Sequence, residues 1–561
     1  MTTRKLLPLL AIGAVSFGAG ALLPRPADLP PITVPMLRAA QEVLGLQFTE
    51  AQLDSTRRGL TDNRQSYEQL RQAKLPNSTS PALVFDPVPL RLRQAMLPNA
   101  RPDAGKLPPM AKIKLPASRD ELAFYTVRQL SELVRTKQVS SEELTQFFLA
   151  RLKKYGPKLF CVTTLTEELA LQQARQADKE IKAGKYRGPL HGIPFGVKDL
   201  FSTKTYKTTW GSVPYKDQVL DEDAAVVTRL REAGGVLVAK FTLGELAMGD
   251  VWYGGKTRTP WDLSQGSSGS SAGSASAVAA GLVPYAIGTE TLGSIVSPST
   301  ACGVTGLRPS FGRVSRAGAM ALSWSMDKVG PLARSAEDCA LVFAALAGAD
   351  ARDPATTMIP AGFRYAFDTD IKKLRVGYLK ADFDKDYPTK ANDQAALEVL
   401  RKLGVQLVPL DLGNLPGSEL RFVLSAEGAA AFDELTRSGR DALMVNQGRN
   451  AWPNSFRTAR FVPAVEYIQA QRVRRQLIED VDKRLQGFDA YLAPSFGGPN
   501  LLITNLTGHP AVVVPNGFRA NGLPSTITFG GQLFEEGKLL ALVKAYQDAT
   551  EFDEKHPPLN F

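Results

Sequence analysis

The residues best suited to chemistry lie between Gly266 and Pro309, where small side chains dominate. Two polar, glycine-rich segments, Gly266–Ser274 and Gly288–Ser299, flank the apolar run Ala275–Ile287. A run of small residues can be a flexible linker, but this apolar centre is typical of a buried helix followed by a strand. A rigid unit of this kind, with a serine-rich loop at each end, can present hydroxyl groups to a substrate.

A serine hydroxyl becomes a nucleophile only when another group removes its proton. Histidine is the commonest base, but the three histidines stand in apolar turns or in the polar tail. These positions favour structural roles for His191, His509 and His556. A lysine can serve instead if burial keeps it uncharged. Both Lys198, after the apolar run Ile193–Val197, and Lys240 end apolar segments, so composition alone does not separate them.

Four segments of this stretch match, in register, the signature of the amidase signature family: Ser268–Ser274, Ala279–Pro284, Gly288–Ile295 and Cys302–Pro309. Further blocks that look like the family are Ser323–Pro331, Asp489–Pro494 and Asn505–Ala511. The chain therefore resembles this family over most of Tyr125–Glu551, and the length of the match makes it far more specific than a short motif.

The resemblance implies a Ser–Ser–Lys triad that hydrolyses amides. The family's nucleophile corresponds to Ser294, its bridging serine, on a cis peptide, to Ser270, and its lysine to Lys198 in the segment Gly196–Asp199. Asp199 itself is interpreted as a structural carboxylate beside the triad. This G-V-K-D context is what favours Lys198 over Lys240.

The mechanism that the resemblance implies begins with neutral Lys198 drawing a proton from Ser270, which draws one from Ser294. Ser294 then attacks the carbonyl, and the proton returns to the leaving amine before water cleaves the acyl-enzyme. A glycine-rich turn leaves the backbone open to a substrate. The oxyanion hole is predicted to consist of the backbone N–H groups of Thr291, Leu292, Gly293 and Ser294.

Two positions depart from the family pattern. Leu292 stands where a second glycine is usual, and Val296 stands where an arginine is common. A leucine would be strained if that position required a positive φ. We expect instead that the loop tolerates Leu292 and that its side chain narrows the substrate pocket, so both changes affect substrate class.

Rival motifs are weaker. Gly269–Gly273 fits the G-x-S-x-G elbow of α/β-hydrolases, but that elbow follows a strand, and the polar segment Asp262–Gly266 is not expected to be one. Ser325–Lys328 fits S-x-x-K, but Gly330-Pro331 follows at once. No spacing of His or Cys indicates a metal site, no Gly-Lys phosphate loop is present, and no cofactor is predicted.

Composition sets broader limits. The chain has 561 residues and a formal net charge of +11, and its basic and acidic residues are interspersed as on solvated helix faces. No nucleic-acid partner is therefore predicted. The three cysteines cannot form a disulfide framework, and we expect Cys161, Cys302 and Cys339 to be buried free thiols.

The N-terminus has the pattern of a targeting segment. Basic Arg4-Lys5 precedes the apolar stretch Leu6–Phe17, and Ala19–Ala21 fits a signal-peptidase site. Residues 1–23 are predicted to be a signal peptide, with an uncleaved membrane anchor as the alternative. The protein is therefore expected outside the cytoplasm, periplasmic or extracellular. Residues 24–116 are predicted to be a helical and proline-rich extension, and residues 117–561 one amidase domain.

Helical patterns alternate with short apolar strands, which indicates an α/β fold. A capping box at Ser140–Glu143 begins a helix that Gly156-Pro157 is expected to end. Strands are expected at Gly192–Val197 and Val236–Ala239. From about residue 350 to about residue 488 the pattern is helical but departs from the family. This region is therefore expected to shape the substrate pocket. The predicted architecture is the amidase signature fold, a large mixed β-sheet with helices on both sides.

We therefore predict an amidase that hydrolyses the carbon–nitrogen bond of a small-molecule amide. One alternative is the glutamine-hydrolysing component of a tRNA-dependent amidotransferase, which releases ammonia from glutamine for charged tRNA. The other is a non-catalytic binding protein on the same scaffold, with Leu292 closing the oxyanion site. The natural amide, its chirality and the oligomeric state stay open, a homodimer being one option.

Overall fold

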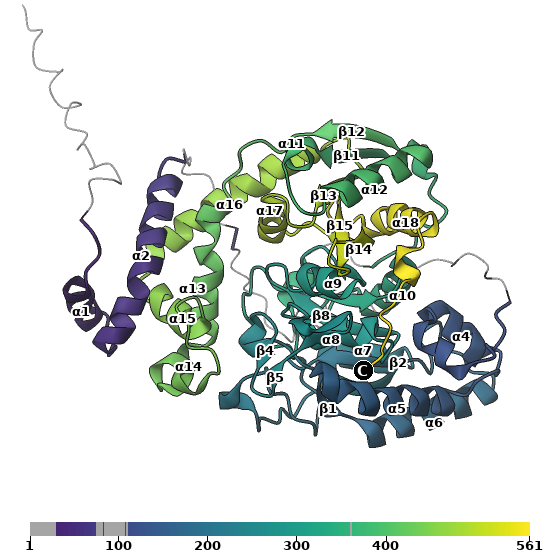
Figure 1. Cartoon of the computed structure of the whole chain (residues 1–561). Helices are drawn as coiled ribbons and strands as arrows, with labels where there is room; N and C mark the ends of the chain where they lie inside the picture. Colours follow the sequence, from purple (N-terminus) through teal and green to yellow (C-terminus); the bar gives the residue numbers. More distant parts are fainter. Residues whose placement is uncertain (1–29, 74–81, 84–106, 108–109, 111, 359–361) are drawn as a thin grey trace, which may run out of the picture.

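The fold is built on one sheet of eleven strands in a computed structural model of the chain (Figure 1). The structure describes all residues except 1–29, 74–81, 84–106, 108–109, 111 and 359–361. The predicted targeting segment, residues 1–23, therefore lies outside the described residues. Across the sheet the strand order is β1-β3-β2-β8-β10-β9-β14-β15-β13-β11-β12.

The strands of this sheet are β1 Val162–Leu165, β2 Pro194–Lys198, β3 Val236–Phe241, β8 Tyr285–Glu290, β9 Thr305–Arg308, β10 Lys328–Ala333, β11 Arg375–Leu379, β12 Gln406–Leu410, β13 Ala490–Pro494, β14 Ala511–Phe518 and β15 Pro524–Gly531. β2 pairs in parallel with β3 and β8, and β11 with β12 and β13, whereas the other pairs are antiparallel. The sheet is therefore mixed, as predicted.

The helices of the described residues are α1 Val34–Val43, α2 Glu50–Leu70, α4 Val127–Arg135, α5 Ser141–Leu159, α6 Glu167–Lys182, α7 Ala225–Glu232, α8 Ala272–Ala279, α9 Val296–Cys302, α10 Ala336–Leu346, α11 Lys380–Asp384, α12 Lys390–Lys402, α13 Phe422–Ala431, α14 Asp433–Arg437, α15 Trp452–Ala459, α16 Ala464–Leu485, α17 Asn500–Thr507 and α18 Glu536–Asp548. None of these helices combines the length and the apolar composition that a membrane span requires.

Helices pack on both faces of the sheet, because successive strand side chains point to opposite sides. In β3, Leu237 belongs to the core cluster that contains side chains of α4 and α10, whereas Val236 and Val238 belong to a second cluster with α5, α6 and α8. The predicted two-sided α/β architecture is confirmed.

The small residues of α8 allow it to lie directly on the sheet. Every residue of this helix is buried, and a Cβ atom at Gly273 would lie 2.4 Å from the carbonyl oxygen of Cys161 and 2.6 Å from the amide nitrogen of Thr242. The run that could have been a linker is therefore a buried helix followed by strand β8, as predicted.

Two local predictions were wrong. Helix α5 does not end at Gly156-Pro157 but continues to Leu159 and ends where Phe160 adopts a left-handed conformation, φ 51°. Proline has no backbone N–H to donate, but its φ is fixed near the helical value. The last turn of a helix can therefore contain a proline. Asp262–Gly266 is a strand, β7, which pairs with β6, Arg258–Thr259, in a surface hairpin where polar side chains stay solvated.

The region of residues 350–488 has the predicted helical texture in α11 to α16, but it also supplies two strands, β11 and β12, to one edge of the sheet. Helices α13 to α15 form a lobe to one side of the sheet, and the N-terminal helices α1 and α2 lie beside them (Figure 1). A further small hairpin joins β4, Val251–Trp252, to β5, Gly255–Lys256.

Candidate active site

Strand β2 delivers Lys198 to the interior at its carboxyl end. The side chain is fully buried, and its Nζ atom lies 2.8 Å from Ser270 Oγ and 2.8 Å from Thr289 Oγ1. Ser270 lies just before the start of α8, and Thr289 lies in β8, so three neighbouring elements meet at this amine. Sequence reasoning had paired Lys198 with Ser270 but had not identified Thr289.

Burial changes the protonation of Lys198. Loss of hydration disfavours the ammonium form and lowers the pKa of Lys198 to about 7, although the carboxylates of Asp327 and Glu290 partly oppose the shift. A lysine with this pKa is largely uncharged in mildly alkaline solution. Its nitrogen lone pair is then free to accept the proton of a neighbouring hydroxyl.

Ser270 stands in a backbone segment of unusual geometry. The peptide bond between Gly269 and Ser270 is cis, as the resemblance implies. The next residue, Ser271, donates its N–H to the carbonyl oxygen of Ser294 at 3.1 Å. This hydrogen bond holds the loop of Ser270 against the loop of Ser294, so the two serine-rich segments meet in space.

The loop that carries Ser294 turns sharply between β8 and α9. Gly293 has a φ of +83°, a conformation that glycine adopts at little cost. Leu292 is not among the residues with positive φ, so the leucine is accommodated without backbone strain, as predicted. Among the described residues, no hydrogen bond uses the N–H group of Leu292, Gly293 or Ser294. The assignment of these groups to an oxyanion hole stays a prediction.

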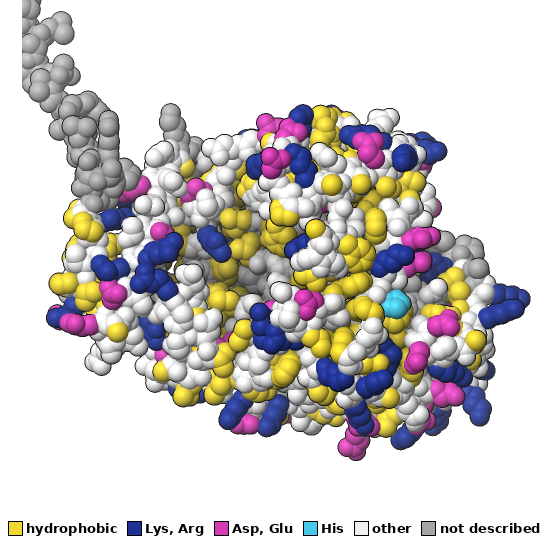
Figure 2. All heavy atoms as spheres, in the orientation of Figure 1, with side chains coloured by type: hydrophobic (Ala, Val, Ile, Leu, Met, Phe, Trp, Pro, Cys, Tyr) yellow, Lys and Arg dark blue, Asp and Glu magenta, His cyan; other side chains and the backbone are white. Residues whose placement is uncertain are grey.

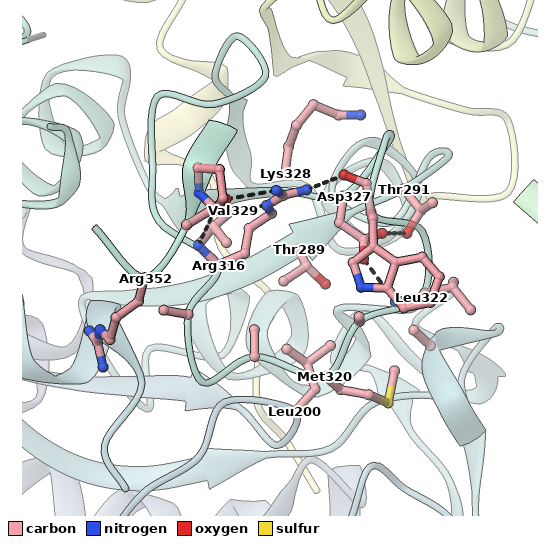
Figure 3. A pocket seen from close by; sticks show the side chains of 17 residues that line it. Leu200, Thr289, Thr291, Arg316, Met320, Leu322, Asp327, Lys328, Val329 and Arg352 are labelled. Carbon is pink, nitrogen blue, oxygen red and sulfur yellow. Dashed lines mark hydrogen bonds and ion pairs between the residues drawn. The ribbon is translucent and has the colours of Figure 1, made fainter. Parts of the chain in front are cut away.

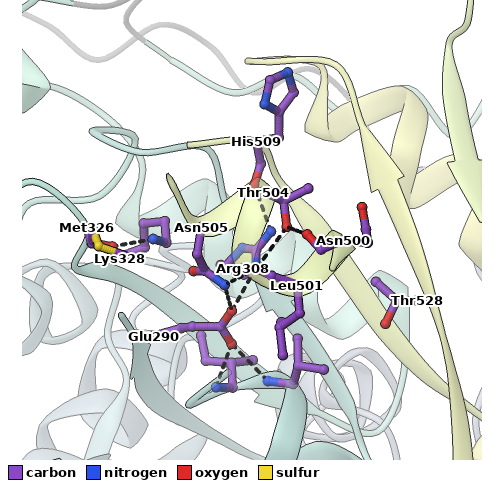
Figure 4. Close-up of polar contacts among 12 residues, drawn as sticks. Glu290, Arg308, Met326, Lys328, Asn500, Leu501, Thr504, Asn505, His509 and Thr528 are labelled. Atoms are coloured by element: carbon purple, nitrogen blue, oxygen red, sulfur yellow. Dashed lines mark hydrogen bonds and ion pairs between the residues drawn. The ribbon is translucent and has the colours of Figure 1, made fainter. Parts of the chain in front are cut away.

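The buried carboxylate of Glu290 holds this loop in shape (Figure 4). One oxygen of Glu290 accepts the N–H groups of Ile295, at 2.8 Å, and Val296, at 3.0 Å. The other accepts from Arg308 Nη1 at 2.7 Å and from Asn505 Nδ2 at 2.8 Å. These contacts, chiefly the Arg308 charge, hold the pKa of Glu290 at about 2 against the opposing effect of burial. The carboxylate therefore stays charged and keeps the loop shaped.

A second carboxylate, Asp327, supports the same loop from the turn that leads into β10. Its Oδ1 atom accepts from Thr291 Oγ1 at 2.6 Å, and its Oδ2 atom accepts the N–H groups of Leu322 and Ser323 at 2.8 and 2.9 Å. The role of Asp327 was not identified from the sequence, although the residue belongs to the Ser323–Pro331 block that resembles the family.

A cavity of about 240 Å³ adjoins these groups (Figure 3). Thr289 and Thr291 form part of its wall, and apolar side chains, among them Leu200, Met320 and Leu322, form much of the rest. An apolar cavity beside hydrogen-bonding groups is the usual form of a small-molecule site. Arg316 also lines it, but its guanidinium is bound to Asp353 at 2.8 Å.

The other candidate bases have other partners. His191 accepts the N–H of Arg187 at 3.0 Å, His509 pairs with Thr507 Oγ1 at 2.8 Å, and His556 stacks on Phe124. Within the described part of the chain, none of the three histidines hydrogen-bonds to Ser270 or Ser294. Their predicted structural roles agree with these contacts.

The other residues that could be mistaken for catalytic groups also have partners outside the candidate site. Lys240 forms a buried ion pair with Asp199 at 2.9 Å, so Asp199 is the structural carboxylate that was predicted. Ser325 Oγ donates to Glu427 at 2.6 Å, and Lys328 contacts the carbonyl oxygen of Met326, so the S-x-x-K pair does not act as a unit. The three cysteines are buried and free, as predicted. In the described ranges no three His, Cys, Asp or Glu side chains are grouped to hold a metal ion.

Comparison with known proteins places this site in a family. The family model described as Amidase matches residues 143–504. The chain is 34% identical over 478 residues to a glutamyl-tRNA(Gln) amidotransferase component from Methylococcus capsulatus, covering 77% of this chain and 98% of the relative. The chain therefore belongs to the amidase family, and the resemblance to amidase signature enzymes is confirmed.

Solved structures agree. Native peptide amidase from Stenotrophomonas maltophilia is 30% identical, with a TM-score of 0.66 over 76% of this chain and 97% of that structure. An amidase family protein from Bacillus anthracis is 29% identical, with a TM-score of 0.70 over 78% of this chain and 93% of that structure. The protein is thus an enzyme that acts on amide bonds and has the amidase signature fold.

Proposed function

We propose that the protein is an amidase in which Lys198 and Ser270 activate Ser294 for attack on a carboxamide. The observation that carries the proposal is the 2.8 Å contact between Lys198 Nζ and Ser270 Oγ at a fully buried lysine. Its pKa of about 7 makes it a base near neutral pH.

The proposed reaction combines the Lys198–Ser270 contact with the roles that the family resemblance implies for Ser270 and Ser294. The amine of Lys198 accepts the proton of Ser270 as Ser270 accepts the proton of Ser294. The Ser294 oxygen attacks the carbonyl carbon, and the N–H groups of the segment Thr291–Ser294 stabilise the negative charge on the carbonyl oxygen. The proton passes back through Ser270 to the leaving nitrogen, the carbon–nitrogen bond breaks, and water hydrolyses the acyl-enzyme to a carboxylate.

A substitution at the nucleophile tests this proposal directly. Purified Ser294→Ala is expected to lose hydrolysis of simple aryl and aliphatic amides by about 10³-fold or more, because the attacking oxygen is gone. Ser297→Ala, in the first turn of α9 just after this loop, is the matched control and should keep its activity. Undiminished turnover by Ser294→Ala would refute the assignment of the nucleophile.

A fluorophosphonate probe separates this proposal from a non-catalytic binding protein. An activated serine reacts with the probe, whereas an inert serine does not. The wild-type protein is expected to be labelled at Ser294, with labelling abolished in Ser294→Ala and strongly slowed in Lys198→Ala. An unlabelled wild-type protein would favour the binding-protein alternative.

The second candidate function, release of ammonia from glutamine within an amidotransferase, is supported by the 34% identity to a glutamyl-tRNA(Gln) amidotransferase component. The targeting pattern of residues 1–23 supports the amidase instead, because charged tRNA is cytoplasmic. We therefore place the protein outside the cytoplasm, either released or held by that segment. Recovery of the native protein in the cytosol with partner proteins, and glutaminase activity only in that complex, would reverse the preference.

A further inference from the structure

A second cavity, of about 510 Å³, lies between α2 and the lobe of α13 and α15. Figure 2 shows basic side chains on the surface of the part of the molecule that α2, α13 and α15 form. Two contacts fix α2 in place on α15. Ser55 Oγ donates to Asn454 Oδ1 at 2.7 Å, and Gly59 packs so closely on Thr458 that a Cβ there would lie 2.8 Å from its methyl group. Helix α2 is therefore packed firmly on α15 and forms a fixed wall of this cavity.

Three arginines line this groove from three different segments. Arg58 comes from α2, Arg421 immediately precedes α13, and Arg449 lies in the segment that leads to α15. Asp62 is the one acidic side chain among the described residues of the lining. None of the three arginines has an ion-pair partner within the described part of the chain. The described lining therefore carries three guanidinium groups and one carboxylate, an excess of positive charge.

A neighbouring arginine of α2 has a different environment. Arg57, next to Arg58 on α2, does not line the cavity and donates to Asp54 at 2.7 Å. The exposed arginine of α14 also has an acidic partner, in the pair of Arg437 with Asp433. Among the described residues, the three arginines that line the cavity thus lack the acidic partners that Arg57 and Arg437 have.

The groove and the cavity of the proposed active site are lined by adjacent residues of the chain. Met248 contributes to its lining, and the preceding residue, Ala247, contributes to the 240 Å³ cavity that Thr289 and Thr291 also line. The two cavities therefore lie on either side of the Ala247–Met248 segment. This adjacency is the observation that relates the arginine groove to the proposed active site.

We propose that this groove binds a carboxylate of the substrate at a distance from the amide that is cleaved. The inference rests on the proposed amidase function and adds the substrate class to it. Guanidinium groups bind carboxylates through paired N–H donors, and the serine hydroxyls of the lining, such as Ser425 and Ser455, add further donors. The preferred substrates are therefore anionic amides, and α2, which precedes the family match, is a specificity element.

Matched substrates test the proposal. One pair consists of the mono-4-nitroanilide of octanedioic acid and the 4-nitroanilide of octanoic acid, which differ in a terminal carboxylate. A second pair carries the carboxylate on the amine side of the amide. The variants are the combined Arg58→Gln/Arg421→Gln/Arg449→Gln protein and, as the matched control, Arg57→Gln, all in the full chain and checked for an unchanged thermal midpoint.

The triple variant is expected to raise KM for the preferred carboxylate substrate by roughly tenfold, because each exposed charge pair contributes modestly. Its kcat, and its kinetics on the uncharged substrate, should match wild type. Moderate salt should weaken wild-type preference, since these charges are solvent-exposed. Equal kinetics of the triple variant and wild type on both carboxylate placements, or an equal KM increase on the uncharged amide, would overturn the proposal.

A binding measurement keeps this inference separate from the proposed catalytic function. If wild type hydrolyses none of these amides, the catalytic proposal fails, and the groove is tested by calorimetric titration with octanedioate. Binding to wild type and to Arg57→Gln, with loss in the triple variant, would uphold the groove as a carboxylate site. Octanedioate binding that is absent, or that the triple variant retains, would refute it.

Discussion

Two buried lysines on neighbouring parallel strands have opposite surroundings. Lys198 ends β2 and Lys240 lies in β3, where its register partner is Val197. Since paired residues face the same side and successive residues alternate, the two lysines point to opposite faces of the sheet. Among the described residues, the hydrogen-bond partners of Lys198 are two hydroxyl groups, those of Ser270 and Thr289, each at 2.8 Å. Lys240 meets the carboxylate of Asp199 at 2.9 Å.

The difference between these sites is a difference in charge. Burial lowers the pKa of both lysines, but for Lys240 the adjacent carboxylate of Asp199 opposes the shift through a direct ion pair. At Lys198 the opposing carboxylates act only at longer range, and the pKa falls to about 7. Identical side chains with identical burial thus become a structural cation in one case and a candidate base in the other.

The largest expected effect is at the candidate base. Lys198→Ala should reduce kcat for amide hydrolysis by about 10³- to 10⁴-fold, because Lys198 is the base that contacts Ser270 in the described part of the chain. Steady-state assays with the aryl amides measure the loss, and a thermal midpoint at or above wild type shows that the fold is kept. Wild-type rates in this variant would end the comparison, since Lys198 would then be as structural as Lys240.

The next effect is on stability. Lys240→Met should destabilise the protein by about 3–5 kcal/mol, because Asp199 would be left buried without its partner. The urea midpoint of unfolding measures this, while kcat per folded molecule should stay near wild type. Lys240→Met/Asp199→Asn, which removes both charges, should be less destabilised. A large fall in kcat with unchanged stability would instead assign Lys240 to catalysis.

The pH dependence sharpens the comparison. Only neutral Lys198 can accept a proton, so kcat/KM should rise about tenfold per pH unit at acidic pH and level off above a midpoint near the lysine pKa of about 7. Assays from about pH 5 to about pH 9 with an uncharged amide test this. A profile without an ascending limb in this range would show that no group with such a pKa is required.

The smallest expected effect concerns how the amine is held. Thr289→Val removes one of the two hydroxyl contacts of Lys198 and should lower kcat/KM by roughly tenfold, the cost of one buried hydrogen bond. Thr289→Ser retains the hydroxyl and should recover most of the loss. A merely structural role of Thr289 would leave the midpoint of the pH profile in place, whereas a positioning role should move it.

Much of this fold could be predicted from local patterns. The apolar run after the serine-rich loop predicted α8 and β8, and capping signals predicted the start of α5. The end of α5 and the strand β7 were mispredicted. Proline in a last helical turn and polar residues in a surface hairpin are permitted by context rather than by propensity. Strands β11 and β12 were missed, because their pairing with the rest of the sheet joins segments far apart in the chain.

The sequence by itself determined the family, the buried strands β2, β3 and β8 and the candidate serines, because each depends on residues that are contiguous in the chain. Only the tertiary structure decided which lysine lacks a carboxylate, that Thr289 and Asp327 support the site, and that arginines from three segments converge on one groove. The pKa of a lysine and the grouping of charged side chains depend on which residues are close in space. Side chains hundreds of positions apart become neighbours only when the chain is folded.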